Sequence, residues 1–128
     1  MKLLLDTHTL IWFLQDDPKL SLRATELIEK PDNEIFVSVV TLWEIAIKVS
    51  LGKLVLNSPF DQIFPQQLLI NNFVVLPIEI THLKQLMLLP FHHGDPFDRL
   101  LIAQSMVEQL IIVGRDRIFD SYNTKCLW

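Results

Sequence analysis

Short, unbroken apolar runs alternate along the chain with longer stretches in which apolar positions recur every three or four residues. An unbroken apolar run is typical of a strand in a parallel sheet that is covered on both faces. The spaced pattern is typical of helices that pack on such a sheet. The runs predict four strands, at residues 2–5, 34–37, 73–76 and 110–113, and a candidate edge strand at 125–127. The spaced stretches predict helices at residues 7–15, 22–30, 39–51, 59–71, 81–89 and 97–109.

Residues that begin and end helices lie at the boundaries of these stretches. Ser38 is an expected N-cap, and Gly52 is expected to end the helix that Ser38 begins. Ser58 and Asp95 are each followed by proline, which is favoured in the first helical turn. Strands that alternate with helices predict an α/β protein, a three-layer α/β/α sandwich with a central, mainly parallel sheet of four to five strands.

Length and composition narrow the class of protein. A chain of 128 residues fits one core, so we expect a single domain over residues 1–128. Half of the residues are hydrophobic and the mean hydropathy is +0.33, so we expect a partner to cover some apolar surface. No apolar run approaches the roughly 20 residues of a membrane span. Cys126 is the only cysteine, which excludes an intrachain disulfide and predicts a cytoplasmic location.

Four acidic residues lie where core segments begin or end. Asp6 directly follows the first apolar run, and Asp116 follows the last long one by two residues. Glu44 and Asp98 lie in the first halves of predicted helices. In open α/β sheets ligands bind beyond the carboxyl ends of the strands, so we expect the four acids to meet there. Converging carboxylates suit Mg²⁺, which predicts a metal-dependent enzyme that acts on phosphodiesters.

The net charge of −4 argues against a non-catalytic nucleic-acid-binding module, which should be basic. It argues less against a metal nuclease, because clustered acids lower the net charge and a bound ion restores positive potential locally. Only 3 glycines occur, so the chain offers no glycine-rich phosphate loop.

Each acid also has a purely structural interpretation. Asp6 could only cap the helix that follows it. Glu44 could pair with Lys48, four residues on, as an ordinary surface ion pair. Asp95 and Asp98 compete for one helix start; we assign the cap to Asp95 and the metal to Asp98. The repetition of the pattern at four sites favours metal binding.

Four stretches of the chain carry a family resemblance. They are Leu4–His8 (LLDTH), Ser38–Lys48 (SVVTLWEIAIK), Leu51–Leu54 (LGKL) and His92–Gln104 (HHGDPFDRLLIAQ). In this order and spacing they make the chain resemble the PIN-domain ribonucleases, in particular the VapC-type toxins of bacterial toxin–antitoxin pairs. The resemblance covers essentially the whole chain, and its last stretch is the most specific.

The resemblance implies one or two Mg²⁺ or Mn²⁺ ions that activate water against an RNA phosphodiester. It places the family's metal ligands at Asp6, Glu44, Asp98 and Asp116. Two positions depart from the family pattern. Gly114 stands where members commonly have Thr or Ser, and Gly94 stands where many close relatives have a basic residue. Neither change removes a metal ligand, so the predicted reaction class is unaffected.

The sequence therefore predicts a metal-dependent endoribonuclease, the toxin of a toxin–antitoxin pair, with RNA as substrate and a cognate antitoxin as protein partner. Candidate substrate-binding residues lie next to the acids: Thr7, Lys48, Arg99, Arg115 and Arg117. The alternative is a catalytically weak PIN-fold binding or scaffold protein. An aspartyl phosphatase of the haloacid dehalogenase type is disfavoured, because His8 stands where that class needs a second Asp.

Large aromatic side chains predict an assembly. Trp12, Trp43, Phe60, Phe64 and Trp128 are spread over the predicted elements. We do not expect one core of this size to bury all of them. We therefore expect a two-fold homodimer, the commonest closed assembly, and a groove that accepts an apolar segment of the antitoxin.

Overall fold

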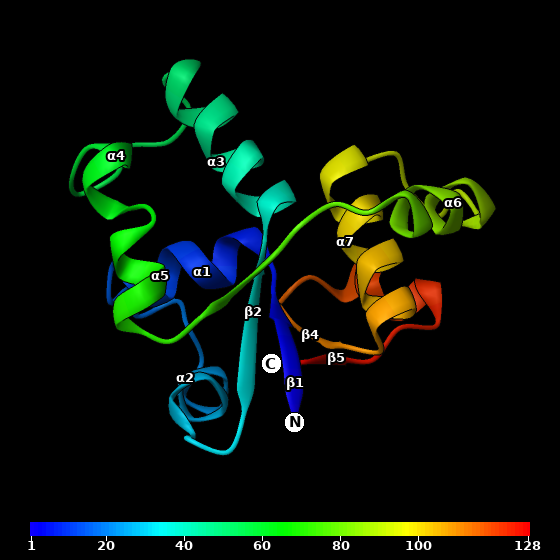
Figure 1. Cartoon of the computed structure of the whole chain (residues 1–128), viewed down its shortest axis with the longest axis horizontal. Coiled ribbons are helices and arrows are strands. Elements are labelled where there is room, and N and C mark those ends of the chain that lie inside the picture. Colours follow the sequence, from blue (N-terminus) through cyan, green and yellow to red (C-terminus); the bar gives the residue numbers. More distant parts are fainter.

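A five-stranded parallel sheet forms the centre of the computed structural model, which describes residues 1–128 (Figure 1). The strand order is β3-β2-β1-β4-β5, and every neighbouring pair is parallel. The strands are β1 (Lys2–Leu5), β2 (Glu34–Ser38), β3 (Val74–Leu76), β4 (Ile111–Val113) and β5 (Cys126–Leu127). The sheet confirms the predicted α/β sandwich, including the edge strand near the C-terminus.

Helices cover both faces of the sheet. They are α1 (Thr7–Leu14), α2 (Leu22–Glu29), α3 (Val39–Ser50), α4 (Phe60–Ile63), α5 (Gln66–Ile70), α6 (Ile80–Leu88) and α7 (Pro96–Glu108), followed by the 3₁₀ helix η1 (Arg117–Tyr122). In Figure 1, α1, α2, α4 and α5 lie on one side of β1 and β2, while α6 and α7 lie on the other. None of the helices is long and apolar enough to span a bilayer.

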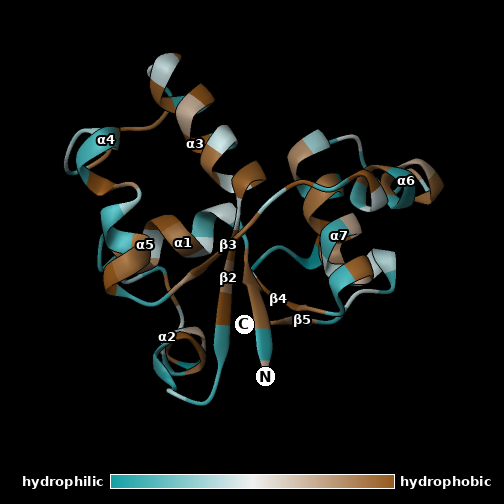
Figure 2. Cartoon of the chain, viewed as in Figure 1, coloured by the Kyte–Doolittle hydropathy of each residue, from teal (hydrophilic) through white to brown (hydrophobic).

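The two faces of β1 belong to two separate hydrophobic cores. Leu3 and Leu5 pack with α1, α2 and β2, whereas Leu4 packs with α7, β4 and η1. Successive side chains of a strand point to opposite faces, so an unbroken leucine run serves both cores at once. Figure 2 shows the same distribution, with hydrophobic residues along the strands and on the helix faces turned toward them.

Several helix boundaries follow the predicted capping residues. The Ser38 hydroxyl accepts a hydrogen bond from Val40 N at the start of α3, and Gly52 after α3 has φ of +70°. The Asp95 carboxylate accepts from the backbone N–H groups of Phe97 and Asp98, with Pro96 in the first turn of α7. Asp95 is therefore the structural cap, as predicted, and leaves Asp98 without a capping role.

The single helix predicted over residues 59–71 is wrong. The structure has two short helices there, α4 and α5, separated by Phe64 and Pro65. Proline disfavours a helical conformation in the residue before it, and Phe64 is extended at φ −114° and ψ 131°. Ser58 provides no cap, because Pro59 itself occupies the N-cap position of α4 without a side-chain hydrogen bond.

Candidate active site

Asp6 lies where β1 ends and α1 begins. Its Oδ1 accepts a hydrogen bond of 3.0 Å from Thr9 N, so the predicted capping role is real. Its backbone N–H donates to the Val113 carbonyl and extends the pairing of β1 with β4. The carboxylate is only 6% exposed, and this burial raises the pKa of Asp6 against the opposing effects of Thr9 and His8. A cap alone does not explain a carboxylate buried this deeply.

Glu44 is the buried acid of α3. It is only 4% exposed, although α3 projects beyond the carboxyl end of the sheet (Figure 1). The Thr7 hydroxyl donates to Glu44 Oε1 at 2.6 Å, which ties α3 to the first turn of α1 beside Asp6. Lys48 Nζ lies 2.7 Å from Oε2, so this carboxylate has its own counter-charge. The Lys48–Glu44 ion pair expected from the sequence is therefore present, but its carboxylate is buried rather than on the surface.

Asp98 lies in the first turn of α7. Burial raises its pKa to about 7, and Asp95, Asp6, Glu44 and Asp116 add to the rise in that order. The four predicted acids therefore lie within electrostatic range of one another, although no three of them surround a common point. The cation-free cluster favours a proton on Asp98 near neutral pH.

Asp116 is the most exposed member of the cluster. It follows β4, and its Oδ1 accepts from Ile118 N at 3.0 Å at the start of η1. A surface hollow between α1 and the end of β4 is lined by Asp6, His8, Trp12, Arg115 and Asp116. The first and last acids of the cluster thus open onto one solvent-accessible space.

The predicted basic residues do not form one continuous rim. The Arg115 guanidinium lies over the Trp12 ring at 4.8 Å, beside the hollow that holds Asp6 and Asp116. Arg117 is 92% exposed at its side chain and pairs with Asp120 at 3.1 Å. Arg115 thus lies beside the acids, whereas Arg117 lines a neighbouring hollow together with Asp116.

Arg99, a candidate substrate-binding residue from the sequence, is buried rather than exposed to a ligand. It is 5% exposed and donates from Nη1 to the Pro90 carbonyl at 2.7 Å and to the Tyr122 hydroxyl at 3.2 Å. The Phe91 ring covers its guanidinium at 4.0 Å. Its donors serve backbone carbonyls of the loop before α7, because that loop would otherwise bury them unpaired. Arg99 is therefore placed to hold this loop.

One residue to which sequence reasoning assigned no role, His93, lies beside Asp98, and a second, Tyr122, contacts His93. His93 Nε2 is 3.4 Å from Asp98 Oδ2, and His93 Nδ1 is 2.6 Å from the Tyr122 hydroxyl. His93 could be placed only in a loop near the site, because loop sequence carries no periodicity. Tyr122 lies 24 residues beyond Asp98, and nothing in its local pattern pointed to the acids.

A sequence comparison decides the family. The profile of the PIN domain matches residues 3–125, which is nearly the whole chain. The chain belongs to the PIN domain family. Members of this family are nucleases. A search of curated protein sequences finds no match to the chain.

Solved structures share this PIN fold at low sequence identity. VapBC2 from Rickettsia felis, bound to a DNA fragment from its promoter, aligns with a TM-score of 0.74 at 16% identity, over 100% of this chain and 99% of that one. FitAcB from Neisseria gonorrhoeae aligns with a TM-score of 0.69 at 17% identity, over 98% of this chain and 96% of that one. A toxin–antitoxin complex from Klebsiella pneumoniae aligns with a TM-score of 0.64 at 14% identity, over 98% of this chain and 95% of that one. At such identities the likeness shows the fold.

The donor set of this PIN domain suits a hard divalent cation. All four acids offer oxygen ligands, and burial followed by the charges of the neighbouring acids raises the pKa of Asp98. As the side chains lie, no three acidic, histidine or cysteine side chains surround a common point. The residues fit such an ion in the chemistry of their donors, although their side chains do not converge on one point.

Proposed function

We propose that this PIN domain is a metal-dependent endoribonuclease that hydrolyses RNA phosphodiester bonds as the toxin of a toxin–antitoxin pair. The observation that carries the proposal is the raised pKa of Asp98 among acids from four separate elements. Stabilising such a cluster without a cation is unfavourable, and perturbed carboxylates in a cleft are typical of functional sites. Family membership supports nuclease chemistry at this edge.

In this proposal Asp6, Glu44 and Asp98 hold Mg²⁺ or Mn²⁺, with Asp116 nearby. Such an ion lowers the pKa of water and neutralises charge that develops on the phosphate oxygens. Thr7 orients Glu44 through its hydroxyl, and Asp98 releases its proton when a cation takes the proton's place. The chain itself supplies no covalent nucleophile: the Cys126 thiol donates to the Gly114 carbonyl, and burial raises its pKa to about 11.

Single-stranded or looped RNA is the proposed substrate, because its phosphates and bases are accessible to a shallow site. Arg115 and Arg117 flank Asp116 and are proposed to contact phosphate. Lys48 is proposed to turn from Glu44 toward phosphate when a metal occupies the acids. Arg99 has no place among these contacts, because its guanidinium is buried under Phe91.

A hollow on the α1 side is the proposed groove for an apolar antitoxin segment. Side chains of α1, α3 and α4 line it, among them Leu14, Ile45 and Ile63. Gln15 also lines it, and its buried amide nitrogen has no hydrogen-bond partner. A backbone carbonyl of an inserted segment would satisfy that donor. The resemblance in fold to VapBC2 and FitAcB is consistent with such a partner.

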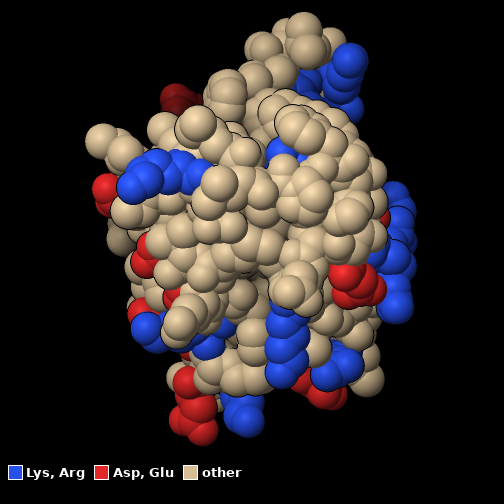
Figure 3. Space-filling view, turned by 90° about the vertical axis from the view of Figure 1, so that its right-hand side faces the viewer, with Lys and Arg blue, Asp and Glu red and all other residues tan.

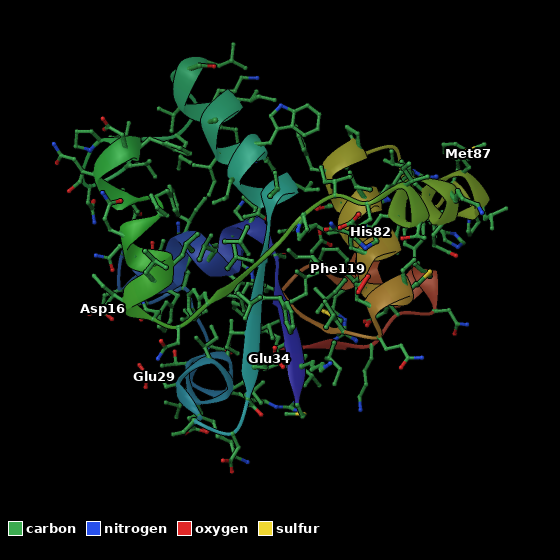
Figure 4. All side chains as sticks on the ribbon, viewed as in Figure 1. Asp16, Glu29, Glu34, His82, Met87 and Phe119 are labelled. Atoms are coloured by element: carbon green, nitrogen blue, oxygen red, sulfur yellow. The ribbon has the colours of Figure 1, made fainter.

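The outer face of α6 and the loop that follows it form the proposed interface of a two-fold homodimer. Ile80, Met87, Leu88 and Phe91 are each at least 77% exposed, and Met87 lies at the outer edge of the molecule in Figure 4. Figure 3 shows this side, where uncharged atoms fill much of the centre and charged residues lie above, beside and below them. The predicted aromatics contribute less than expected, since Trp12 and Phe64 are buried in the core. Light scattering at micromolar concentration tests the dimer; a strict monomer would contradict it.

The nuclease itself is tested with a short RNA that carries a single-stranded loop. We expect cleavage with Mg²⁺ or Mn²⁺, none in EDTA, and recovery when the metal is returned. The Asp98→Asn variant checks that the activity belongs to this chain. Full cleavage in EDTA or by Asp98→Asn would refute the proposal.

A catalytically weak binding or scaffold protein is the second candidate. The close Lys48–Glu44 pair favours it, because the ammonium already occupies the place where a cation would neutralise Glu44. Isothermal titration with Mn²⁺ separates the two candidates. A nuclease binds the ion at the acids, whereas a scaffold of this kind gives no heat of binding that Asp6→Asn abolishes.

A further inference from the structure

The Tyr122 hydroxyl is the centre of a buried polar cluster behind Asp98. Tyr122 comes from the end of η1 and is almost completely buried. Its oxygen lies 3.1 Å from His93 N, 3.2 Å from Arg99 Nη1 and 2.6 Å from His93 Nδ1. The cluster joins the C-terminal part of the chain to the loop before α7 and to α7 itself.

The donors around this oxygen determine where its proton lies. The backbone N–H of His93 and the guanidinium of Arg99 can only donate, so together they use both lone pairs of the hydroxyl oxygen. Two acceptors remain for the hydroxyl proton, His93 Nδ1 at 2.6 Å and the His93 carbonyl at 3.4 Å, and the much shorter contact assigns the proton to the bond with Nδ1. His93 Nδ1 is therefore an acceptor and carries no hydrogen.

A neutral imidazole has one donor and one acceptor nitrogen. With Nδ1 as the acceptor, the ring hydrogen is on Nε2, and this nitrogen faces Asp98 Oδ2 at 3.4 Å. The hydrogen bonds thus run in one direction, from Tyr122 to His93 and from His93 to Asp98. This is the arrangement by which outer groups orient a ligating side chain.

We propose that His93 is a positioning residue for Asp98, and that Tyr122 acts through it by fixing the tautomer that places an N–H against the carboxylate. The proposal rests on the proposed metal-dependent nuclease, in which Asp98 is a ligand. The hydrogen bond holds one carboxylate oxygen, so the other is left to face the remaining acids.

The surrounding contacts show why the histidine can do this although it lies in a loop. Arg99 donates to the carbonyls of Pro90 and Leu89, and Phe91 lies on its guanidinium. The loop is therefore anchored on one side of His93 by Arg99, while Asp95 caps α7 on the other. A loop fixed at both sides presents its imidazole in one orientation.

The first experiment reads the tautomer of His93 directly, by ¹⁵N NMR of the labelled full chain in EDTA at about pH 8. We expect His93 to be the Nε2–H tautomer in the wild type and to lose that preference in Tyr122→Phe, which keeps the ring but not the hydroxyl. A wild-type His93 in the Nδ1–H form overturns the proposal. This measurement does not depend on metal or on RNA.

The second experiment compares two amides at position 93. In His93→Gln the side-chain NH₂ reaches the place of Nε2, whereas in His93→Asn it reaches only the place of Nδ1. We expect Mn²⁺ affinity, measured by the electron paramagnetic resonance of free Mn²⁺, to fall by about tenfold or more in His93→Asn and in Tyr122→Phe. His93→Gln should stay within about threefold of the wild type, which is well short of that loss.

His92→Asn is the matched control, because His92 is exposed and packs its ring edge against Tyr122 without a hydrogen bond to Asp98. It should bind Mn²⁺ as the wild type does. Equal affinities in folded His93→Asn, His93→Gln and wild type would overturn the positioning role. Absence of Mn²⁺ binding and RNA cleavage in the wild type would instead refute the proposed function, while the NMR result would still decide whether Tyr122 fixes the tautomer.

Discussion

Glu44 on α3 and Asp98 on α7 are two carboxylates of one cluster with opposite surroundings. Glu44 accepts from Thr7 and pairs with Lys48, so hydrogen bonds and a cation stabilise its charge. Asp98 is partly buried, with Asp95 at the N-cap of the same helix and three other acids nearby; burial first and these charges second raise its pKa to about 7. Its polar partner, His93, is a weaker compensation because the ring is neutral in the tautomer inferred above.

The difference indicates where positive charge is missing. On the α3 side the chain supplies the cation itself, and on the α7 side it supplies a proton or leaves room for an ion. A charge cluster that is half compensated binds cations at its uncompensated half first. The α7 side is therefore where loss of a carboxylate should have the largest consequence.

The largest effect is expected from Asp98→Asn, which removes the uncompensated charge. RNA cleavage should fall by at least about two orders of magnitude, the scale of a key electrostatic group, as measured by single-turnover cleavage in Mg²⁺. The matched control is Asp95→Asn, which also removes one negative charge from this turn but keeps a residue that caps helices well. If Asp95→Asn lost as much activity as Asp98→Asn, net charge rather than the Asp98 carboxylate would be responsible.

The pH dependence of stability should also single out Asp98. Its folded pKa is about 7 against an ordinary value of 3.8, so between these values the folded chain retains a proton that the unfolded chain has released. The stabilisation is fully present below about pH 4 and is lost as the pH rises through about 7. At about 1.4 kcal/mol per pKa unit, the free energy of unfolding should fall by at most about 4 kcal/mol.

Denaturant unfolding in EDTA at pH 5 and pH 8 measures this loss. Asp98→Asn should show a clearly smaller drop than the wild type, because its amide does not titrate. Saturating Mg²⁺ at pH 8 should restore stability to the wild type and not to the variant. Equal pH dependence in the two proteins would mean that Asp98 titrates normally in the folded state.

Lys48→Met should leave the α3 side of the cluster without a counter-charge for its carboxylate, as on the α7 side. Methionine keeps the length of the apolar stem and removes the ammonium that lies 2.7 Å from Glu44. We expect Mn²⁺ to bind severalfold more tightly in titration calorimetry, because the ion no longer competes with an internal cation. Lys84→Met on exposed α6 is the control for loss of one positive charge. Weaker Mn²⁺ binding in Lys48→Met alone would show that Lys48 supports the site rather than competes for it.

The smallest effect is expected from Arg117→Ala, at a side chain that is 92% exposed. Stability should change by no more than about 0.5 kcal/mol, as for other surface positions. RNA affinity should weaken modestly, and the slope of log affinity against log salt should fall by about one, as for a single phosphate contact. RNA affinity is measured by fluorescence anisotropy in the Asp98→Asn background, in which the RNA is not cleaved. An unchanged salt slope would show that Arg117 does not contact the substrate.

Local signals in the sequence were sufficient for most of the fold. Buried parallel strands need unbroken apolar runs, and Leu3–Leu5 is one that serves two cores. Caps such as Ser38 and Asp95 act on neighbouring backbone groups, so their roles are visible locally. The neighbourhood of the four acids also followed, since parallel strands end at one edge. Their role as metal ligands remains a prediction.

Features that depend on contacts between distant segments were missed. Arg99 reads as a surface cation, and only the folded loop shows that its donors satisfy carbonyls at positions 89 and 90. The split between α4 and α5 has a local signal in Pro65, but the apolar pattern continues across it and favours a single helix. Tyr122 meets His93 only because η1 returns to α7, which no periodicity reports.

Gly114 has a consequence for how this chain can change over generations. A Cβ at this position would lie 2.7 Å from Asp6 Oδ2 and 3.3 Å from Phe119, so any larger residue must displace the carboxylate that the first strand presents. A serine or threonine at this position would therefore require the Asp6 carboxylate to shift. The two positions are expected to change together rather than independently.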